Sequence, residues 1–181
     1  MKATGIVRRI DDLGRIVIPK EIRRTLRIRE SDPLEIFTDR EGEIILKKYS
    51  PIGEMTAFAK QYAESLAQVS GKIALIADRD QFIAVSGGFK NLHGQYLSRE
   101  LEEKLDRREI VMANRAERGF IPIDKDGSAE YAQEIISPIL CEGDVIGAVI
   151  LLATEEKADM TGAEKKLVQT AANFLGKQME Q

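Results

Sequence analysis

The chain has 181 residues, 43% of them hydrophobic, and its 27 basic and 30 acidic side chains leave a formal net charge of −3. That composition excludes a disordered chain and allows one core of about 120 to 130 residues beside a smaller module. No stretch is apolar enough for a membrane-spanning helix and the start lacks a signal-peptide pattern, so we expect a cytoplasmic protein with no membrane partner.

Positive charge is concentrated at the start of the chain. Residues 1–29 carry nine basic side chains against three acidic ones, a local charge of +6. Residues 1–48 have a net charge of +3, and the remaining 133 residues have one of −6. A polyanion is the natural partner of such a patch, and we expect double-stranded DNA. The asymmetry also predicts two domains with different roles.

Residues 1–48 are predicted to fold in the order β-β-α-β-β. The expected strands are 4–10, 15–18, 33–38 and 43–47. Residues 11–14 have the composition of a tight turn, so the first two strands should form a hairpin, and Pro19 suits the first position of a helix over Lys20–Arg27. A unit this small buries too little surface to be stable alone. We therefore expect a dimer through residues 1–48 that shares one core and presents a two-fold basic surface.

The basic side chains of the predicted helix do not help it to form. Arg23 and Arg27 are like charges four residues apart, which costs roughly a few tenths of a kcal/mol. The clustering therefore favours a ligand, with phosphate contacts supplying affinity and arginine forks to guanine supplying sequence preference. Arg8 and Arg9 lie on opposite faces of their predicted strand, and periodicity alone does not choose between them.

The segment Gly5–Ile28, together with Leu34–Phe37 and Ile45–Pro51, resembles the swapped-hairpin DNA-binding domain of AbrB-type transition-state regulators. The resemblance covers nearly all of residues 1–51 and implies a DNA-contacting set of Arg8, Arg15, Arg23 and Arg24. The other basic side chains of the patch are secondary candidates: Arg9, Lys20 and Arg27. Ser31 stands where the family commonly has glycine, and because serine avoids positive φ, we expect a slightly altered turn there.

The second part of the chain starts with a helix signal. Ser50 and Pro51 have the pattern of an N-cap and a first helical residue, so we expect a linking helix over 51–71 that also begins the second domain. The remaining domain, 72–181, is predicted to contain strands at 72–78, 81–87, 132–141 and 144–153 and helices at 96–108 and 161–180. Thr161 and Glu164 form a capping box for the last helix. Residues 110–129 are ambiguous.

An antiparallel sheet with terminal helices on one face is an α+β arrangement. Its paired-strand segment Ile135–Leu151 resembles that of GAF domains, and the similarity extends over about residues 52–181. We therefore expect an α+β chain with a β-rich swapped-hairpin dimerisation and DNA-binding domain over 1–50, followed by a GAF-like antiparallel-sheet domain with flanking helices. The GAF resemblance implies small-molecule sensing or oligomerisation but names no ligand, so the ligand-binding residues stay unknown.

No catalytic constellation is visible in the sequence. Gly87 and Gly88 lack the spacing of a phosphate loop, and the single histidine His93 and the single cysteine Cys141 do not form a nucleophilic pair or a zinc site. The acidic run over 100–106 alternates with basic residues at helical spacing, as a solvated helix face does. We expect no enzyme activity, no cofactor and no metal site.

Together the two resemblances indicate the transcription factors of endospore-forming bacteria that join these domains. The expected function is a DNA-binding regulator of sporulation (forespore) genes, as activator or repressor. It would be tetrameric through helices 52–69 and 161–180, with a small-molecule ligand as an open option. The alternative is an antitoxin of a toxin–antitoxin pair that binds DNA and a toxin, although such antitoxins usually continue into a disordered acidic tail. A GAF-like enzyme with a nucleic-acid-binding arm is disfavoured by the missing catalytic residues.

Overall fold

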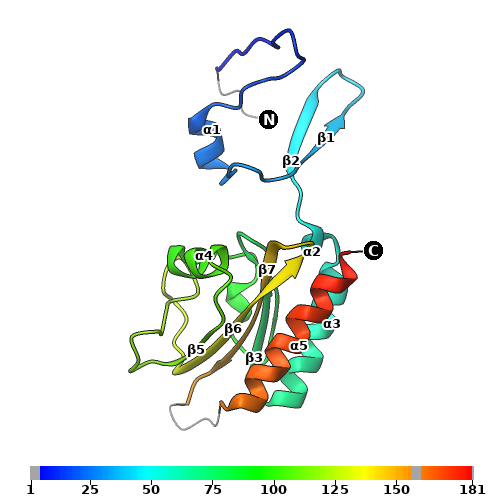
Figure 1. The fold of residues 1–181 in the computed structure, drawn as a ribbon. Coiled ribbons are helices and arrows are strands. Elements are labelled where there is room, and N and C mark those ends of the chain that lie inside the picture. The colour runs from blue at the N-terminus through cyan, green and yellow to red at the C-terminus, as the bar shows by residue number, and fades with distance from the viewer. Residues whose placement is uncertain (1–4, 156–159, 181) are drawn as a thin grey trace. The chain divides into compact units, whose positions relative to one another are not determined.

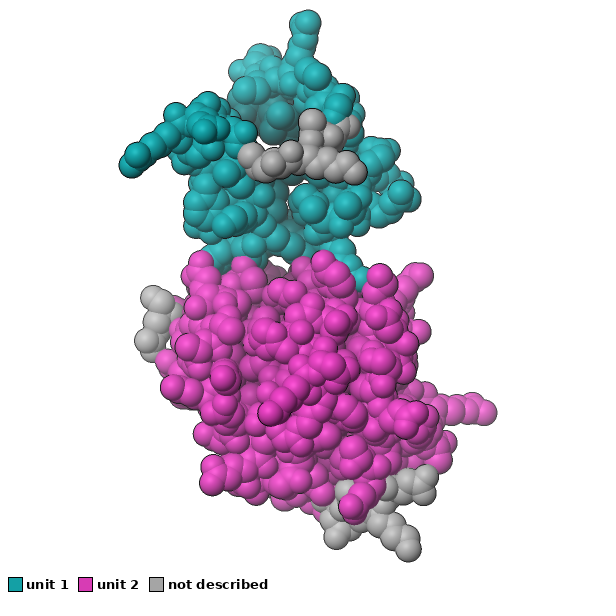
Figure 2. All heavy atoms as spheres, turned by 180° about the vertical axis from the view of Figure 1, so that it is seen from behind, with its two compact units in different colours: residues 1–49 teal, residues 50–181 magenta. Residues whose placement is uncertain are grey.

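The computed structural model describes residues 5–155 and 160–180 (Figure 1). The chain divides into two compact units, residues 1–49 and 50–181 (Figure 2). Both units combine helices with antiparallel strands, which confirms the predicted α+β class. Among the described residues, no helix has both the length and the apolar character needed to cross a membrane.

The first unit holds one short helix and one β-hairpin. Its elements are α1 (Lys20–Thr25), β1 (Leu34–Thr38) and β2 (Ile44–Lys48). β1 and β2 pair antiparallel, within one residue of the predicted bounds. Asp39 holds the turn between them, because its Oδ1 accepts hydrogen bonds from the N–H groups of Glu41 and Glu43 at 3.0 and 2.8 Å.

Only the turn of the first predicted hairpin is formed, and the strands on either side of it do not pair as a sheet. The Gly14 N–H donates to the Asp11 carbonyl at 3.0 Å, which confirms the predicted turn. The predicted strands are wrong for the single chain, because residues 5–10 and 15–18 carry no strand. Thr4, where the first strand was predicted to begin, lies outside the described residues. An isolated two-stranded hairpin is marginal in water, and no strand among the described residues pairs with these segments.

α1 ends two residues earlier than predicted, because the chain turns left-handed behind it. Arg27 has a φ of 53°, and the Ile28 N–H donates to the Arg23 carbonyl at 2.8 Å, which closes the helix in a Schellman-type end. Ser31 also has a positive φ, of 66°. The serine therefore adopts a backbone conformation that glycine would take with less strain.

The second unit begins with two helices in place of the single predicted one. They are α2 (Pro51–Glu54) and α3 (Thr56–Ser70). Ser50 caps α2 as predicted, because its Oγ accepts from the Gly53 N–H at 3.1 Å. The prediction of a continuous helix over 51–71 is wrong at Met55. There the Thr56 hydroxyl donates to the Gly53 carbonyl at 2.5 Å and competes for an acceptor that a continuous helix gives to its main chain.

The rest of the second unit is a five-stranded sheet with flanking helices. The strands are β3 (Ile73–Ala77), β4 (Phe82–Ser86), β5 (Val111–Asn114), β6 (Gln133–Cys141) and β7 (Asp144–Ala153), and the helices are η1 (Lys90–Leu92, 3₁₀), α4 (Arg99–Asp106) and α5 (Gly162–Gln178). The strand order is β4-β3-β7-β6-β5, all antiparallel. Glu142 and Gly143 turn the β6–β7 hairpin with positive φ at both positions. This hairpin and the capping box of Thr161 and Glu164 confirm the predictions.

α4 is shorter than the helix predicted over 96–108. Tyr96 and Leu97 form isolated β-bridges to other segments, so the helix begins only after Ser98, whose side chain caps it. Part of the ambiguous segment 110–129 becomes the edge strand β5. Both differences come from pairing with segments that are distant in the sequence, which local periodicity does not register.

The sheet is packed on both faces, so the second unit has its own core. On one face α3 and α5 run alongside each other (Figure 1) and bury Ala63 and Val168 against Ile76. On the other face Leu101 of α4 packs in one cluster with Phe82. The terminal helices therefore share one face of the sheet, as predicted.

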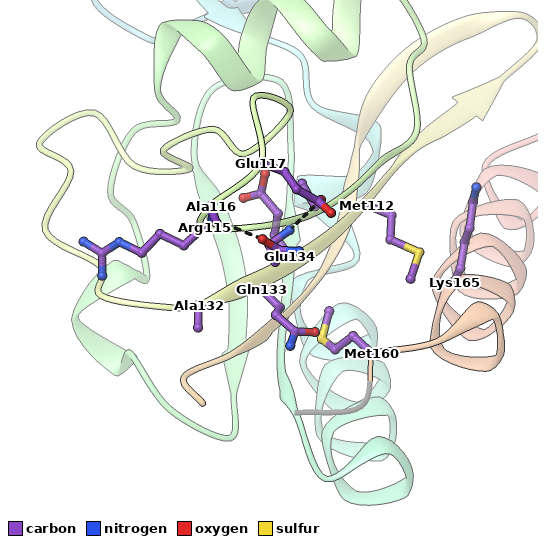
Figure 3. Close-up of a pocket in the computed structure, with 11 residues that line it drawn as sticks. Met112, Arg115, Ala116, Glu117, Ala132, Gln133, Glu134, Met160 and Lys165 are labelled. Carbon is purple, nitrogen blue, oxygen red and sulfur yellow. Dashed lines mark hydrogen bonds between the residues drawn. The ribbon is translucent and has the colours of Figure 1, made fainter. Parts of the chain in front are cut away.

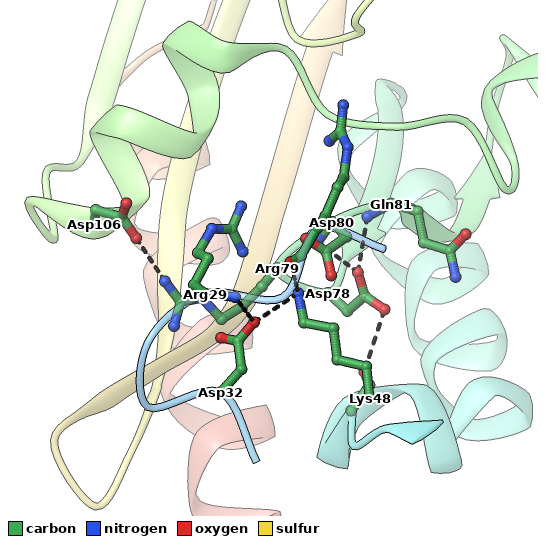
Figure 4. Close-up of polar contacts among 10 residues, drawn as sticks. Arg29, Asp32, Lys48, Asp78, Arg79, Asp80, Gln81 and Asp106 are labelled. Atoms are coloured by element: carbon green, nitrogen blue, oxygen red, sulfur yellow. Dashed lines mark hydrogen bonds and ion pairs between the residues drawn. The ribbon is translucent and has the colours of Figure 1, made fainter. Parts of the chain in front are cut away.

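Polar contacts anchor the last residues of the first unit and the first residues of the second, each within its own unit (Figure 4). In the first unit Lys48 Nζ, at the end of β2, lies 2.9 Å from Asp32 Oδ2. In the second unit Ser50 Oγ donates to Oδ2 of the buried Asp78 at 3.2 Å.

Replacing Gly176 with alanine is expected to destabilise the second unit. An added Cβ would lie 2.0 Å from the Leu140 carbonyl oxygen of β6, so α5 would have to move off the sheet. We expect the free energy of unfolding, measured by urea denaturation, to fall by about 1–3 kcal/mol. Gly162→Ala, in open space at the start of α5, is the matched control and should not lower it. Unchanged stability of Gly176→Ala would contradict the close approach of helix and strand.

Candidate nucleic-acid interface

The basic side chains of the predicted DNA-contacting set lie on three segments of the first unit. One segment is α1, which carries Lys20, Arg23 and Arg24. Lys20 and Arg24 are exposed, whereas Arg23 is half-buried, and its shielded Nε has no hydrogen-bond partner among the described residues. Leaving a shielded donor unpaired is unfavourable. Of the three side chains, Arg23 therefore has the clearest need for an acceptor from outside the chain.

The second segment is residues 5–10, which form no helix or strand and carry Arg8 and Arg9. Both side chains are exposed, and neither has an ion pair within the part of the chain that the structure describes. Their charges are therefore not neutralised inside the unit. The equal exposure does not separate Arg8 from Arg9, so the preference for Arg8 still depends on the family resemblance.

The third segment is the turn that ends at Arg15, and Asp11 fixes it. Asp11 Oδ1 accepts from the N–H groups of Leu13 and Arg15 at 3.0 and 2.8 Å, and its Oδ2 accepts from Arg15 Nε at 2.8 Å. These hydrogen bonds, from the Arg15 N–H first and then from its side chain, hold the pKa of Asp11 below its usual range. This role of Asp11 was not predicted from the sequence, because a spacing of four residues indicates a side-chain contact in a helix and residues 11–14 were predicted as a turn.

Two other basic residues hold the fold together. Lys48 Nζ donates to the Arg27 carbonyl at 2.8 Å and pairs with the carboxylate of Asp32, which is 1% exposed (Figure 4). Asp32 also accepts from the Arg29 N–H at 2.8 Å. These contacts tie β2 to the turn behind α1. Arg27, a secondary candidate for DNA contact, is half-buried, and its left-handed backbone ends α1.

The first unit leaves its apolar side chains uncovered. Among residues 5–49, only Pro19 is buried, and no apolar core forms. The large apolar side chains that stay exposed are Ile6, Val7, Ile10, Leu13, Ile16, Val17, Leu26, Ile36, Phe37, Ile44, Leu46 and Tyr49. A patch of this kind on a soluble protein marks an interaction surface. The geometry of this unit therefore calls for a second surface to cover it.

A second uncovered apolar surface lies on the helices of the second unit. Phe58 and Tyr62 of α3 and Phe174 of α5 form an aromatic cluster with ring centroids 5.7 to 6.2 Å apart. Phe174 is 41% exposed, and Leu167 on the same helix is 36% exposed. These residues, which we call the helix-face patch, extend the apolar core outward across both terminal helices.

The second unit also contains a cavity of about 730 Å³ at its edge strand (Figure 3). It is lined by Met112, Ala113, Asn114, Arg115, Ala116, Glu117, Ala132, Gln133, Glu134, Met160 and Lys165. Glu117 Oε2 accepts from the Asn114 N–H at 3.0 Å, which caps one outward-facing donor of β5. The volume is in the range of small-molecule sites, and the lining mixes thioethers, amides and both signs of charge.

Glu134 is a buried acid that anchors the loop over this part of the sheet. It is fully shielded from solvent, and its Oε1 accepts from the Ile121 N–H at 2.9 Å. Its Oε2 has no hydrogen-bond partner among the described residues. Burial raises the pKa of Glu134 to about 7, against the lowering effect of the hydrogen bond from Ile121 and of the nearby Tyr131 hydroxyl. Glu134 was not predicted from the sequence, because one acid in an apolar strand has no local signature.

Comparison with known proteins covers both units. The family described as "Stage V sporulation protein T C-terminal, transcription factor" matches residues 54–180, and the one described as "Antidote-toxin recognition MazE, bacterial antitoxin" matches residues 7–54. Stage V sporulation protein T of Bacillus subtilis (strain 168) is 53% identical over 100% of both chains. The transition state regulatory protein AbrB of that organism is 51% identical over 41% of this chain and 77% of its own.

A solved structure gives the fold of the second unit. The GAF domain from an Acinetobacter phosphoenolpyruvate-protein phosphotransferase superposes on 69% of this chain and 81% of its own with a TM-score of 0.57. The sequence identity of 17% makes this a likeness of fold alone. It confirms the GAF-like architecture predicted for the second unit.

The raised pKa of Glu134 predicts a pH-dependent loss of stability. A carboxyl whose pKa rises from 4.5 to about 7 on folding favours the folded state only while protonated, so its contribution is lost as pH rises through that window. Glu134→Gln mimics the protonated acid and should remove this loss, which is at most about 3 kcal/mol. Urea denaturation from pH 5 to pH 8 measures it. The exposed Glu130→Gln is the control, and parallel pH profiles for wild type and Glu134→Gln would contradict the burial effect.

Proposed function

Because the chain belongs to the stage V sporulation protein T family of transcription factors, we propose that it regulates sporulation genes through DNA contacts made by four arginines of its first unit. The chain is a transcription factor with an AbrB-like DNA-binding domain. The proposed contacts are Arg8, Arg15, Arg23 and Arg24, with Arg9, Lys20 and Arg27 in supporting roles. The exposed, largely unneutralised basic side chains of this unit carry the proposal.

The first unit is proposed to act as a dimer through residues 1–48. Its segments 5–10 and 15–18 form no strand, and many of its apolar side chains stay exposed among the described residues. A second copy supplies both the missing strand partners and the missing core. A two-fold pair of units would also repeat the basic segments at two half-sites of a duplex.

The second unit is proposed to join two such dimers into a tetramer. The helix-face patch lies on α3 and α5, the two helices within the ranges 52–69 and 161–180 for which the sequence predicts association. Aromatic residues are enriched at protein interfaces, and here the rings of Tyr62 and Phe174 are already stacked, so these side chains need little ordering.

A small-molecule ligand of the second unit belongs to the same proposal. The cavity beside β5 has a suitable volume and a mixed polar and apolar lining. A ligand bound there would change DNA affinity only if it favoured one arrangement of the assembly over another. Membership of a transcription-factor family favours a binding protein over an enzyme, and a DNA-binding regulator would act in the cytoplasm, where bacterial DNA lies.

The antitoxin alternative has support only in the first unit. The antitoxin family matches residues 7–54, which is the part that the two kinds of protein share. From residue 54 onward the chain matches the transcription-factor family and forms a packed domain. A toxin-binding antitoxin of the expected type would have a disordered acidic tail there.

Removing Arg23 and Arg24 together should weaken DNA binding and flatten its salt dependence. If about eight phosphates are neutralised per dimer, the log–log slope of affinity against salt is near −7, and losing about four charges makes it shallower by about 3 to 4. Fluorescence anisotropy with a mixed-sequence duplex over a salt series measures both. Arg40→Ala, at an exposed arginine of the β1–β2 turn, is the control and should keep most of the slope. A double variant with the wild-type slope would refute the assignment of these two arginines.

Placing a charge in the helix-face patch should separate the tetramer into dimers. Phe174→Glu would bury a carboxylate among Phe58 and Tyr62 if the patch were an interface, so association there would be lost. Light scattering coupled to size exclusion should show the mass of two chains in place of four. Lys60→Glu, on an exposed position of α3, should keep the wild-type mass. If Phe174→Glu also kept that mass, the proposed interface would be wrong.

A further inference from the structure

The turn before Arg15 is built around a single acid. Asp11 forms hydrogen bonds with both the backbone and the side chain of Arg15, and its own N–H donates to the Arg15 carbonyl at 3.0 Å. Its Oδ1 also accepts from Leu13. Every polar group of Asp11 is therefore engaged within the turn. These contacts favour one direction of the Arg15 side chain before any DNA binds.

The contact with Asp11 leaves the outer edge of the guanidinium available. It uses Nε alone, and among the described residues no acceptor is found for the two terminal nitrogens of Arg15. The side chain is 70% exposed. Two parallel N–H donors at the end of a fixed side chain match the O6 and N7 acceptors of guanine in the major groove. Fixing the side chain in advance also lowers the entropy lost on binding.

The same contact makes Arg15 a poor phosphate ligand. A carboxylate oxygen 2.8 Å from Nε offsets the positive charge of the guanidinium, so the pair as a whole gains little from a polyanion. Arg8, Arg9 and Arg24 have no such acidic partner in the described part of the chain, and their full charges suit the phosphate backbone. A neutral base edge, in contrast, is recognised by the direction of donors more than by net charge.

We infer that Asp11 is a positioning residue for DNA recognition, which aims Arg15 at a base edge, most simply a guanine, and so gives Arg15 a role in sequence discrimination more than in affinity. This inference rests on the proposed DNA-binding function. Asp11 does not touch DNA in this account. It acts through Arg15, and its own negative charge opposes DNA binding in general.

Asp11→Asn and Asp12→Asn form a matched pair that tests the inference. Both remove one negative charge from the same turn, but Asp12 is exposed and has no hydrogen-bond partner among the described residues. In Asp11→Asn the Oδ1 acceptor for the turn is kept, while an NH₂ group faces the Nε donor of Arg15 and releases it. Melting temperatures of the full-length variants report whether the turn survives.

The measurement compares two duplexes by fluorescence anisotropy. One is selected from a random-sequence pool by the wild-type protein, and the other is a scrambled duplex of the same composition. We expect Asp12→Asn to raise affinity for both duplexes by a similar factor. Asp11→Asn should raise affinity for the scrambled duplex and lower it for the selected one, so that the specificity ratio falls about tenfold. In an Arg15→Ala background, Asp11→Asn should leave the ratio unchanged.

Two results would overturn the inference. One is a ratio that changes no more in Asp11→Asn than in Asp12→Asn, and the other is an equal change with and without Arg15. Neither result affects the proposed DNA binding itself, which is tested separately by the Arg23 and Arg24 variants. If Arg15→Ala binds both duplexes like the wild type, Arg15 leaves the contact set and this inference fails with it, while DNA binding through α1 can still stand.

Discussion

The structure depends most on the inability of the first unit to bury its own apolar side chains. Among its described residues only Pro19 is buried, and side chains such as Val7 and Val17 remain 88% and 72% exposed. Exposing so much apolar surface is unfavourable in water, so the unit is completed by another surface. A second copy of the same unit satisfies this need and at the same time doubles the basic segments. Stability and DNA recognition are thereby linked, because the fold that buries the apolar residues also presents the arginines.

The second unit has the opposite character, because it is self-sufficient. Its sheet is packed on both faces, and at close contacts such as that of Gly176 with β6 there is no room for a larger side chain. This unit is therefore stable by itself, and part of its exposed apolar surface is the helix-face patch on α3 and α5. The proposed ligand site of this unit is the edge-strand cavity, whose lining includes the shielded Glu134 with its raised pKa.

Local signals explain what the sequence could predict. The capping box at Thr161, the cap at Ser50 and the β6–β7 turn are set by neighbouring residues, and all three are confirmed. Some failures are local, such as the helix break at Met55, and others are non-local: among the described residues, the predicted strands over 5–10 and 15–18 have no strand partner. The helix before Arg99 is shortened by bridges to distant segments. The basic character of the site was readable from composition, whereas the contact of Asp11 with Arg15 needed geometry.

Hydrogen exchange of the full-length protein tests most directly whether a second copy completes the first unit. If strands from a partner pair with residues 5–10 and 15–18, their backbone amides should be protected for as long as those of β1 and β2. The single chain offers these segments few acceptors, so protection there would have to come from association. Exchange at the rates of an unfolded peptide, at concentrations where the protein binds DNA, would contradict the account.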